Sequence, residues 1–370
     1  MSFGTSEEQE ELRESVRRFV TDRAPLSRVR ELMNSGEIDK DFWSQAGAQL
    51  GLQGIAIPEE YGGSGFSFNE QAIVLEELGS GLYGGPYLPS AVLAAYALLA
   101  SPDESARQEL LPGIASGETI AALAFTEEDG SWDPASIRLA AAKSGDGWVL
   151  DGHKSFVLSG AEATLFLVVA VADGGLSLFA VDAGASGLAA TALPVLDQTR
   201  NLARLDFDAV PARLVGSAGD AAAILDRVLD VAAIALAAEQ LGGAQHALDI
   251  TVDYTKTRHQ FGRPIGSFQA LKHRMADLLM EVESLRSAVA YAASAVSDDS
   301  EEVPALASLL KAYASETYFH VAAEMIQMHG GIGFTWEHDA HLFFKRAKST
   351  ELFLGDGAYH RERLAQRIGL

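Results

Sequence analysis

The sequence predicts an α+β chain in which a run of helices is followed by an all-β insert and then by a second run of helices. Apolar residues recur at helical spacing in the first and last thirds of the chain. Between them, from about Ile120, short β-favouring runs alternate with turn segments rich in Gly and Asp. Because helices and strands do not alternate, and no strand–GxGxxG–helix unit is present, a doubly wound dinucleotide-binding fold is excluded.

The first third contains a clear helix start and one clear break. Ser6 followed three residues later by Gln9 is a capping-box pattern, which predicts a helix from that point. The segment 58–67 (PEEYGGSGFS) then interrupts the helical pattern with Gly and Pro. Helices are expected to resume over three segments: Gln71–Leu78, Ala91–Ala100 and Ser105–Ile114.

The β-favouring runs are separated by SGDG, LDGHK and ADGG, which is typical of a small antiparallel unit, and Pro211 is expected to close it. Long helical patterns return from about Ala218 to the end. We therefore expect three domains: an all-α domain over 1–118, a β domain over 119–217 and a helical domain over 218–370.

Composition excludes several classes of protein. A net charge of −23 argues against nucleic acid and anionic membranes as partners, because both need a basic surface. The chain has no cysteine, so disulfide and thiolate chemistry are excluded. The N-terminus is charged almost at once, unlike a signal peptide, and the apolar stretches are too short to span a bilayer. A cytoplasmic location is expected.

The segment RHQFGRPIGSFQ (258–269) has the chemistry of a diphosphate site. Arg258 offers a permanent charge and a planar fork of donors, which suits a diphosphate. Phe261 could pack on a flat ring, and Gln269 could hydrogen-bond a polar edge. The alternative is a helix–turn–helix corner that carries a surface arginine.

The segment QMHGGIGF (327–334) places glycines directly after a helix. Gly330, Gly331 and Gly333 would let the backbone approach a ligand closely, with Gln327 beside them. The alternative is a glycine helix cap, which is very common.

Together these two segments resemble the C-terminal half of the flavin-dependent acyl-CoA dehydrogenases, and the resemblance covers essentially the whole chain. Further matching segments are IPEEYGGSGFS, LPGIASGE, FTEEDGS and LDGHKSFVLSG. The resemblance implies an N-terminal helical domain, a middle antiparallel β-barrel domain and a C-terminal four-helix bundle. It also implies a tetramer with FAD at a subunit interface. The residues expected to hold the adenosine-diphosphate end of the neighbour's flavin are Arg258, Phe261, Gln269, Gln327 and Gly331.

Two stretches of the β domain are expected to face the flavin ring. In FTEEDGS, Thr126 takes the position of a hydroxyl that holds the ring in the family. In the second stretch, Phe156 can cover the ring, but Leu158 replaces the hydroxyl that would bond flavin N5. Contacts from this chain to the isoalloxazine are therefore weakened.

The catalytic base is missing from both places where the family keeps it. The reaction removes an α-proton from an acyl-CoA while a hydride leaves the β-carbon for the flavin, so it needs a carboxylate. Leu354 stands where most members carry Glu, and Ala232–Ala233 stands at the position used by a minority. Neither can accept a proton.

Three carboxylates could substitute for the missing base. Asp356 lies two residues past Leu354 and is the best single candidate. Glu239, on the earlier helix, and Glu351, one turn before Leu354, are the others. For each of them the alternative is an ordinary surface or capping carboxylate.

Two functions remain open. The first is an active FAD-dependent acyl-CoA dehydrogenase, an oxidoreductase of fatty acid or steroid catabolism, with Asp356 as an unusual base and a homotetrameric assembly. The second is a non-catalytic subunit that contributes flavin contacts to an α2β2 heterotetramer with a related chain, as in steroid-type relatives. Either would act on an acyl-CoA and pass electrons to an electron-transfer flavoprotein. His338 and His341 could share a helix face, but no further ligand follows, so no metal is expected.

Overall fold

The protein is described by a computed structural model over residues 6–370. The chain before residue 120 is helical, as predicted. Its α-helices are α1 (Glu7–Arg23), α2 (Leu26–Ser35), α3 (Lys40–Leu50), α4 (Phe68–Ser80), α5 (Ala95–Ala100) and α6 (Glu104–Ser116). Ser6 and Gln9 form the predicted capping box, in which each backbone N–H donates to the other's side chain at 3.1 Å.

One predicted helix differs in kind. The segment expected to be an α-helix over Ala91–Ala100 begins as the π-helix η3 (Tyr87–Ala94), and only the part after it is the α-helix α5. Ser90 in η3 accepts a hydrogen bond from the backbone N–H of Ala121 at 3.1 Å, which ties this helix to the first strand. The π-helix thus places the Ser90 hydroxyl where the backbone N–H of Ala121, at the start of β1, needs an acceptor.

The middle of the chain forms one curved sheet. Its strands are β1 (Ala121–Ala124), β2 (Ala140–Ser144), β3 (Gly147–Leu158), β4 (Leu165–Ala172), β5 (Gly175–Asp182), β6 (Leu188–Ala192) and β7 (Leu202–Val215). They pair in the order β1-β4-β2-β3-β7-β5, β6 adds to β7, and β5 also pairs with β4, which closes the ring. Most pairings are antiparallel, as expected, but β1 and β2 both pair with β4 in parallel.

Pro211 does not close the β unit, contrary to the prediction. It lies inside β7, opposite Val149 of β3. Along β7, pairing with β6 ends at Phe207 and pairing with β5 starts at Arg213. Pro211 falls between them, where neither of these strands needs its missing N–H, so a proline is tolerated in the middle of a long strand.

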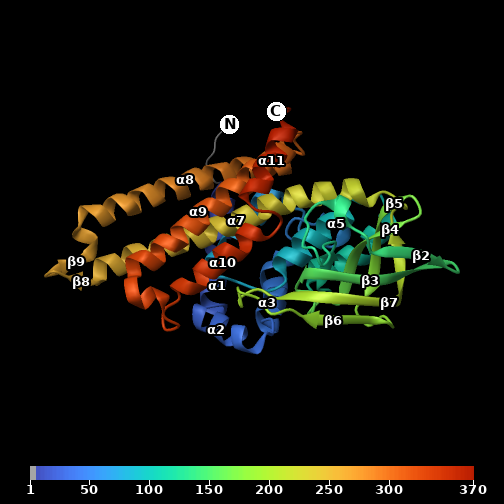
Figure 1. Ribbon diagram of the computed structural model, residues 1–370, viewed down its shortest axis with the longest axis horizontal. Helices are drawn as coiled ribbons and strands as arrows, with labels where there is room; N and C mark the ends of the chain where they lie inside the picture. Colours follow the sequence, from blue (N-terminus) through green and yellow to red (C-terminus); the bar gives the residue numbers. More distant parts are fainter. Residues whose placement is uncertain (1–5) are drawn as a thin grey trace. The chain divides into compact units, whose positions relative to one another are not determined.

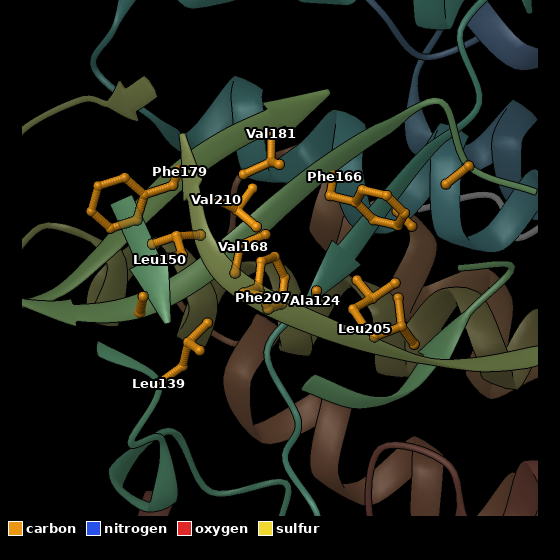
Figure 2. Packing of buried hydrophobic residues seen from close by; sticks show 14 of the residues in the cluster. Ala124, Leu139, Leu150, Phe166, Val168, Phe179, Val181, Leu205, Phe207 and Val210 are labelled. Carbon is orange, nitrogen blue, oxygen red and sulfur yellow. The ribbon is translucent and has the colours of Figure 1, made fainter. Parts of the chain in front are cut away.

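The inside of the ring is filled by apolar side chains from nearly every strand. Figure 2 shows Phe166 and Val168 of β4, Phe179 and Val181 of β5 and Leu205 of β7 turned toward the same interior. The rings of Phe166 and Phe179 are 1% and 0% exposed. Burial of this kind is the main favourable term in folding, so these residues fix the β unit that carries the stretches containing Thr126 and Phe156.

The last part of the chain is a bundle of long helices, as predicted (Figure 1). They are α7 (Ala221–Thr257), α8 (Gln269–Ser297), α9 (Val303–His329), α10 (Ala340–Leu352) and α11 (Gly357–Arg367). A small hairpin of β8 (His259–Gln260) and β9 (Arg263–Pro264) joins α7 to α8, and the 3-10 turn η6 (Gly330–Phe334) follows α9. Helix α9 packs against α8, α10 and α11.

Helices α4 and α7 approach each other more closely than side chains would allow. A Cβ added at Gly242 of α7 would lie 1.8 Å from the backbone oxygen of Glu76 in α4. A Cβ at Gly79 of α4 would lie 2.1 Å from the backbone oxygen of Glu239 in α7. The two glycines thus make a reciprocal backbone contact that no other residue type permits.

By its internal packing the chain forms two compact units. One contains residues up to 31, 68–83 and 233–370, and the other contains 32–67 and 84–232. This division does not test the predicted domain boundaries at 118 and 217, which stay a prediction. No helix within residues 6–370 combines the length and the apolar character needed to cross a membrane.

We predict that Gly242→Ala lowers the free energy of unfolding by about 1–3 kcal/mol, because the new methyl group must push two backbones apart. Thermal unfolding followed by circular dichroism measures this. Gly147→Ala is the matched control, since a Cβ there meets nothing closer than 3.9 Å. Equal melting temperatures for the two variants would show that the helix contact is not tight.

Candidate cofactor and active site

The two stretches of the β unit that are expected to face a flavin ring are bonded to each other. Thr126 Oγ1 donates to the backbone oxygen of Ser155 at 2.6 Å, and the Ser155 N–H donates to the Thr126 oxygen at 3.0 Å. The pairing of β3 with β7 is interrupted between Lys154 and Val157, so the chain bulges at this point. Phe156 lies in the bulge with φ of 58° and is 37% exposed. A bulge can re-aim a side chain, which here turns Phe156 outward.

A buried ion pair that sequence reasoning missed lies beneath the bulge. Lys154 Nζ lies 2.8 Å from Glu127 Oε1 and 3.1 Å from the backbone oxygen of Phe125. Burial lowers the pKa of Lys154 to about 8, although Glu127 opposes this. Burial favours protonation of Glu127, but bonds from Lys154 and two backbone N–H groups leave its pKa below the ordinary value. The only sign of this pair in the sequence was the presence of Glu127 in FTEEDGS and of Lys154 in LDGHKSFVLSG.

Leu158 ends β3 opposite Leu202 of β7 and is 5% exposed. Its side chain is part of the buried apolar surface of the β unit and carries no donor.

The hairpin between α7 and α8 is a basic and aromatic surface. Residues 254–276 contain five Lys and Arg and no Asp or Glu, although the whole chain has 51 acidic residues against 28 basic ones. Arg258 is exposed, and its guanidinium makes no hydrogen bond or ion pair within residues 6–370. Such a segment in an acidic protein favours an anionic ligand.

Phe261 of this hairpin is 91% exposed and has φ of 54°. Its ring meets that of Phe268 edge-on, with 6.1 Å between the two centroids. The guanidinium of Arg263 stacks on the Phe268 ring at 4.0 Å from its centroid. Gln269 is the first residue of α8 and is exposed. A large apolar side chain held outward in a rarely used backbone conformation is typical of a binding surface.

The second glycine segment is equally open. Gln327 is exposed near the end of α9, and a Cβ added at Gly331 would meet nothing within 4 Å. Gly330 has φ of 63° and ψ of −140°, a conformation restricted to glycine. Phe334 just beyond is 85% exposed. These residues fit the adenosine-diphosphate end of FAD: a permanent cation, an aromatic face and accessible backbone.

The structure places Leu354 at a special backbone position. It lies in the turn between α10 and α11 with φ of 63°, and it is 4% exposed. Ala232 and Ala233, at the other position where a base was sought, are 0% and 1% exposed within α7. No ionisable side chain stands at either place.

The three alternative carboxylates all have structural partners. Asp356 caps α11, because its Oδ1 accepts from the Tyr359 N–H at 2.8 Å. Glu351 pairs with Lys348 at 3.0 Å on the surface of α10. A role of Asp356 as a base stays a prediction.

Glu239 is the third alternative, and it is buried. Its Oε1 lies 3.1 Å from Nη1 of Arg346 in α10, with side chains 7% and 2% exposed. Arg346 also donates to the backbone oxygens of Leu82 and Tyr83, both at 3.3 Å. A carboxylate held in this way neutralises a buried cation and links α7 to α10.

A second buried cation lies behind the turn that carries Leu354. Lys311 of α9 is 0% exposed, and its Nζ donates to the backbone oxygens of Glu351 and Gly355 at 3.1 and 2.9 Å. Burial lowers its pKa to about 7, opposed by the charges of Glu351 and Asp356. Sequence reasoning missed Lys311, because its burial is set by contacts with residues 351 and 355, which are distant in sequence.

The two histidines weighed as metal ligands have other neighbours. His338 packs on the ring of His329 at 4.4 Å, and His341 lies against Trp336 at 4.6 Å. Within residues 6–370 no three His, Cys, Asp or Glu side chains come together as a metal site.

Comparison with known families covers nearly the whole chain. Residues 6–118 match the N-terminal domain of acyl-CoA dehydrogenases, residues 122–210 match the middle domain and residues 221–369 match the C-terminal domain. Acyl-CoA dehydrogenase IpdE2 of Mycobacterium tuberculosis is 38% identical over 94% of this chain and 93% of its own length.

Solved structures agree. One titled a steroid ACAD variant, Tcur3481-Tcur3483, superposes with a TM-score of 0.89 at 35% identity and covers 98% of both chains. The ChsE4-ChsE5 complex of Mycobacterium tuberculosis gives 0.91 at 32% identity, covering 100% of this chain and 99% of the other. Both titles name two gene products together.

We predict that Glu239→Ala destabilises the protein by about 3–5 kcal/mol, because Arg346 is left as an uncompensated buried charge. Denaturant unfolding measures the change. The control is Glu316→Ala, which removes an exposed pair with Arg361 and should cost less than about 1 kcal/mol. Similar losses for the two variants would contradict a structural role for Glu239.

Proposed function

Since this chain belongs to the acyl-CoA dehydrogenase family, we propose that it takes part in the α,β-desaturation of an acyl-CoA thioester as a flavin-holding subunit whose catalytic base comes from a related chain. The observation that carries this proposal is the contrast between Leu354 and the hairpin at 258–269. The position of the base holds a buried leucine, while the residues for the diphosphate remain present and exposed.

FAD fits the residues that this chain offers. Arg258 supplies a permanent charge with no competing partner within the described residues, Gly331 leaves open space beside the backbone, and Phe261 offers a ring face. When bound, FAD accepts the hydride that leaves the β-carbon of the substrate. The residues of this chain bind and orient the cofactor, and none at positions 232, 233 or 354 can take the α-proton.

A heteromeric assembly explains both halves of this contrast. Losing the general base slows the desaturation by orders of magnitude. Selection on an active enzyme would therefore not keep the flavin-binding residues at 258–269 and discard the base. A subunit that only clamps the flavin needs Arg258 and does not need Glu at 354. The two similar structures whose titles name paired gene products support an α2β2 arrangement.

The alternative is a homotetramer in which Asp356 acts as the base. Its capping bond to Tyr359 argues against this role, because a carboxylate that holds a helix end is not free to move toward a substrate. For either assembly we propose an acyl-CoA of the steroid type as the first substrate to test, an electron-transfer flavoprotein as the electron acceptor and a cytoplasmic location.

We predict that the chain purified alone contains little flavin and that a related glutamate-bearing chain restores a stoichiometric flavin band. In that assembly Arg258→Ala should weaken FAD binding roughly 10–100-fold, because a hydrogen-bonded charge at the diphosphate is lost. Visible absorption and native mass measure both effects. The control is Arg361→Ala, which removes an exposed arginine paired with Glu316. A yellow, active homotetramer of the chain alone would contradict the proposal.

We predict that Asp356→Asn leaves turnover of the assembly and its stability unchanged. Asparagine caps a helix about as well as aspartate but cannot act as a base, so this variant separates the two roles. Asp356→Ala should cost about 1 kcal/mol of stability without affecting turnover per folded assembly. Loss of turnover in Asp356→Asn with flavin retained would identify Asp356 as the base.

A further inference from the structure

The turn between α10 and α11 is held in an unusual conformation at two consecutive residues. Leu354 has φ of 63° and Gly355 has φ of 101°. A Cβ at 355 would lie 2.2 Å from Tyr359 Cδ1, so only glycine fits there. A leucine in the left-handed region is strained, and it persists only where its surroundings over-determine the backbone.

Lys311 fixes both ends of this turn. Its Nζ donates to the oxygens of Glu351, before the turn, and of Gly355, at its end. The third proton goes to Ser315 Oγ at 2.9 Å, one turn along α9. All three donors of the ammonium are used on neutral oxygens, and the side chain has no exposure.

His360 fixes the middle of the turn. Its Nε2 lies 2.9 Å from the oxygen of Leu354, and because a carbonyl only accepts, Nε2 carries the proton. The Nδ1 atom is buried and has no hydrogen-bond partner among residues 6–370. Burial and the charge of Lys311 lower the pKa of His360 to about 4, so the ring stays neutral and keeps this tautomer.

The three backbone oxygens at 351, 354 and 355 are therefore bonded to two buried side chains from α9 and α11. A connection between two helices does not need this. Desolvating an unpaired ammonium is costly, so the arrangement indicates that the direction of residue 354 matters. Position 354 is also where the family resemblance places the base.

Building on the proposed function, we propose that Lys311 and His360 are positioning residues that hold a preformed turn for a catalytic base. The residue type at position 354 alone then decides whether the turn carries a base. In this chain the turn is formed, but Leu354 cannot accept a proton. Leu354→Glu would place a carboxylate in a buried site, where desolvation raises its pKa. The Lys311 ammonium, bonded to the backbone oxygens of residues 351 and 355, is expected to limit that rise.

The test uses four variants of the full chain: Leu354→Glu and its non-ionisable counterpart Leu354→Gln, each with Lys311 and with Lys311→Met. Each is assembled with a related chain whose own catalytic glutamate is replaced by glutamine, so that residue 354 is the only base under test. Infrared difference spectra between the Glu and Gln variants, recorded across pH, follow the carboxyl at 354. We expect it to titrate above the ordinary value of about 4.3. Lys311→Met should raise its pKa by at least one unit, a tenfold change in proton affinity.

Base function is measured by exchange of the α-protons of a steroid-type acyl-CoA in D2O. The carboxylate at residue 354 takes the α-proton, and the resulting enolate takes up a deuteron that comes from the solvent, so no oxidant is needed. Leu354→Glu should exchange roughly 100-fold faster than Leu354→Gln. His360→Gln keeps a donor for the Leu354 oxygen and should preserve this rate, whereas His360→Ala should reduce it.

An unchanged carboxyl pKa in folded Lys311→Met, or equal exchange in the Glu and Gln variants, overturns the inference. If a steroid-type acyl-CoA perturbs no flavin band in any variant, the proposed function fails instead, and the infrared result still decides the role of Lys311. If Leu354→Glu does not fold, Lys311→Met in the native chain must speed amide exchange at 351–357 while the rest of α9 stays protected; equal exchange overturns the inference.

Discussion

The contact between α4 and α7 at Gly79 and Gly242 is the constraint on which the helical unit depends. It brings the backbones so close that the neighbouring side chains cannot intervene, and they must turn to either side. On α4 these are Glu76 and Glu77, which are buried and therefore have to be paired. Arg13 and Arg17 of α1 and Arg286 of α8 bond them.

The same contact sets the depth of Glu239, whose backbone oxygen faces Gly79. At that depth a carboxylate needs a cation, and Arg346 of α10 reaches it. One glycine contact thereby fixes the positions of α1, α8 and α10 through charges instead of apolar packing alone. Buried ion pairs add little net stability, but removing one partner is costly, so they hold the helices to a single arrangement.

At two places this chain uses buried polar side chains to hold the backbone, although it lacks the reactive side chain that the family carries there. Lys311 and His360 bond backbone oxygens on both sides of and at Leu354. Thr126 bonds the backbone oxygen of Ser155, next to the Phe156 bulge, and Lys154 bonds that of Phe125. In both places buried polar groups are used to position main chain. Phe261 of the 258–269 segment is, by contrast, 91% exposed.

The sequence alone determined the order helix, strand, helix, the capping box at Ser6 and the family, because these depend on local periodicity, on side chains three residues apart and on short motifs. It also showed that no ionisable residue stands at 354 or 232–233. The tertiary structure decided that Glu239 is paired with Arg346, that Asp356 caps α11 and that Lys311 is buried behind the turn. It also showed that Pro211 continues a strand and that η3 is a π-helix. The Glu239–Arg346 pair, the burial of Lys311 and the pairing of Pro211 in β7 depend on partners distant in sequence. The burial of a side chain, and hence its charge state, is set by neighbours that the local pattern does not contain.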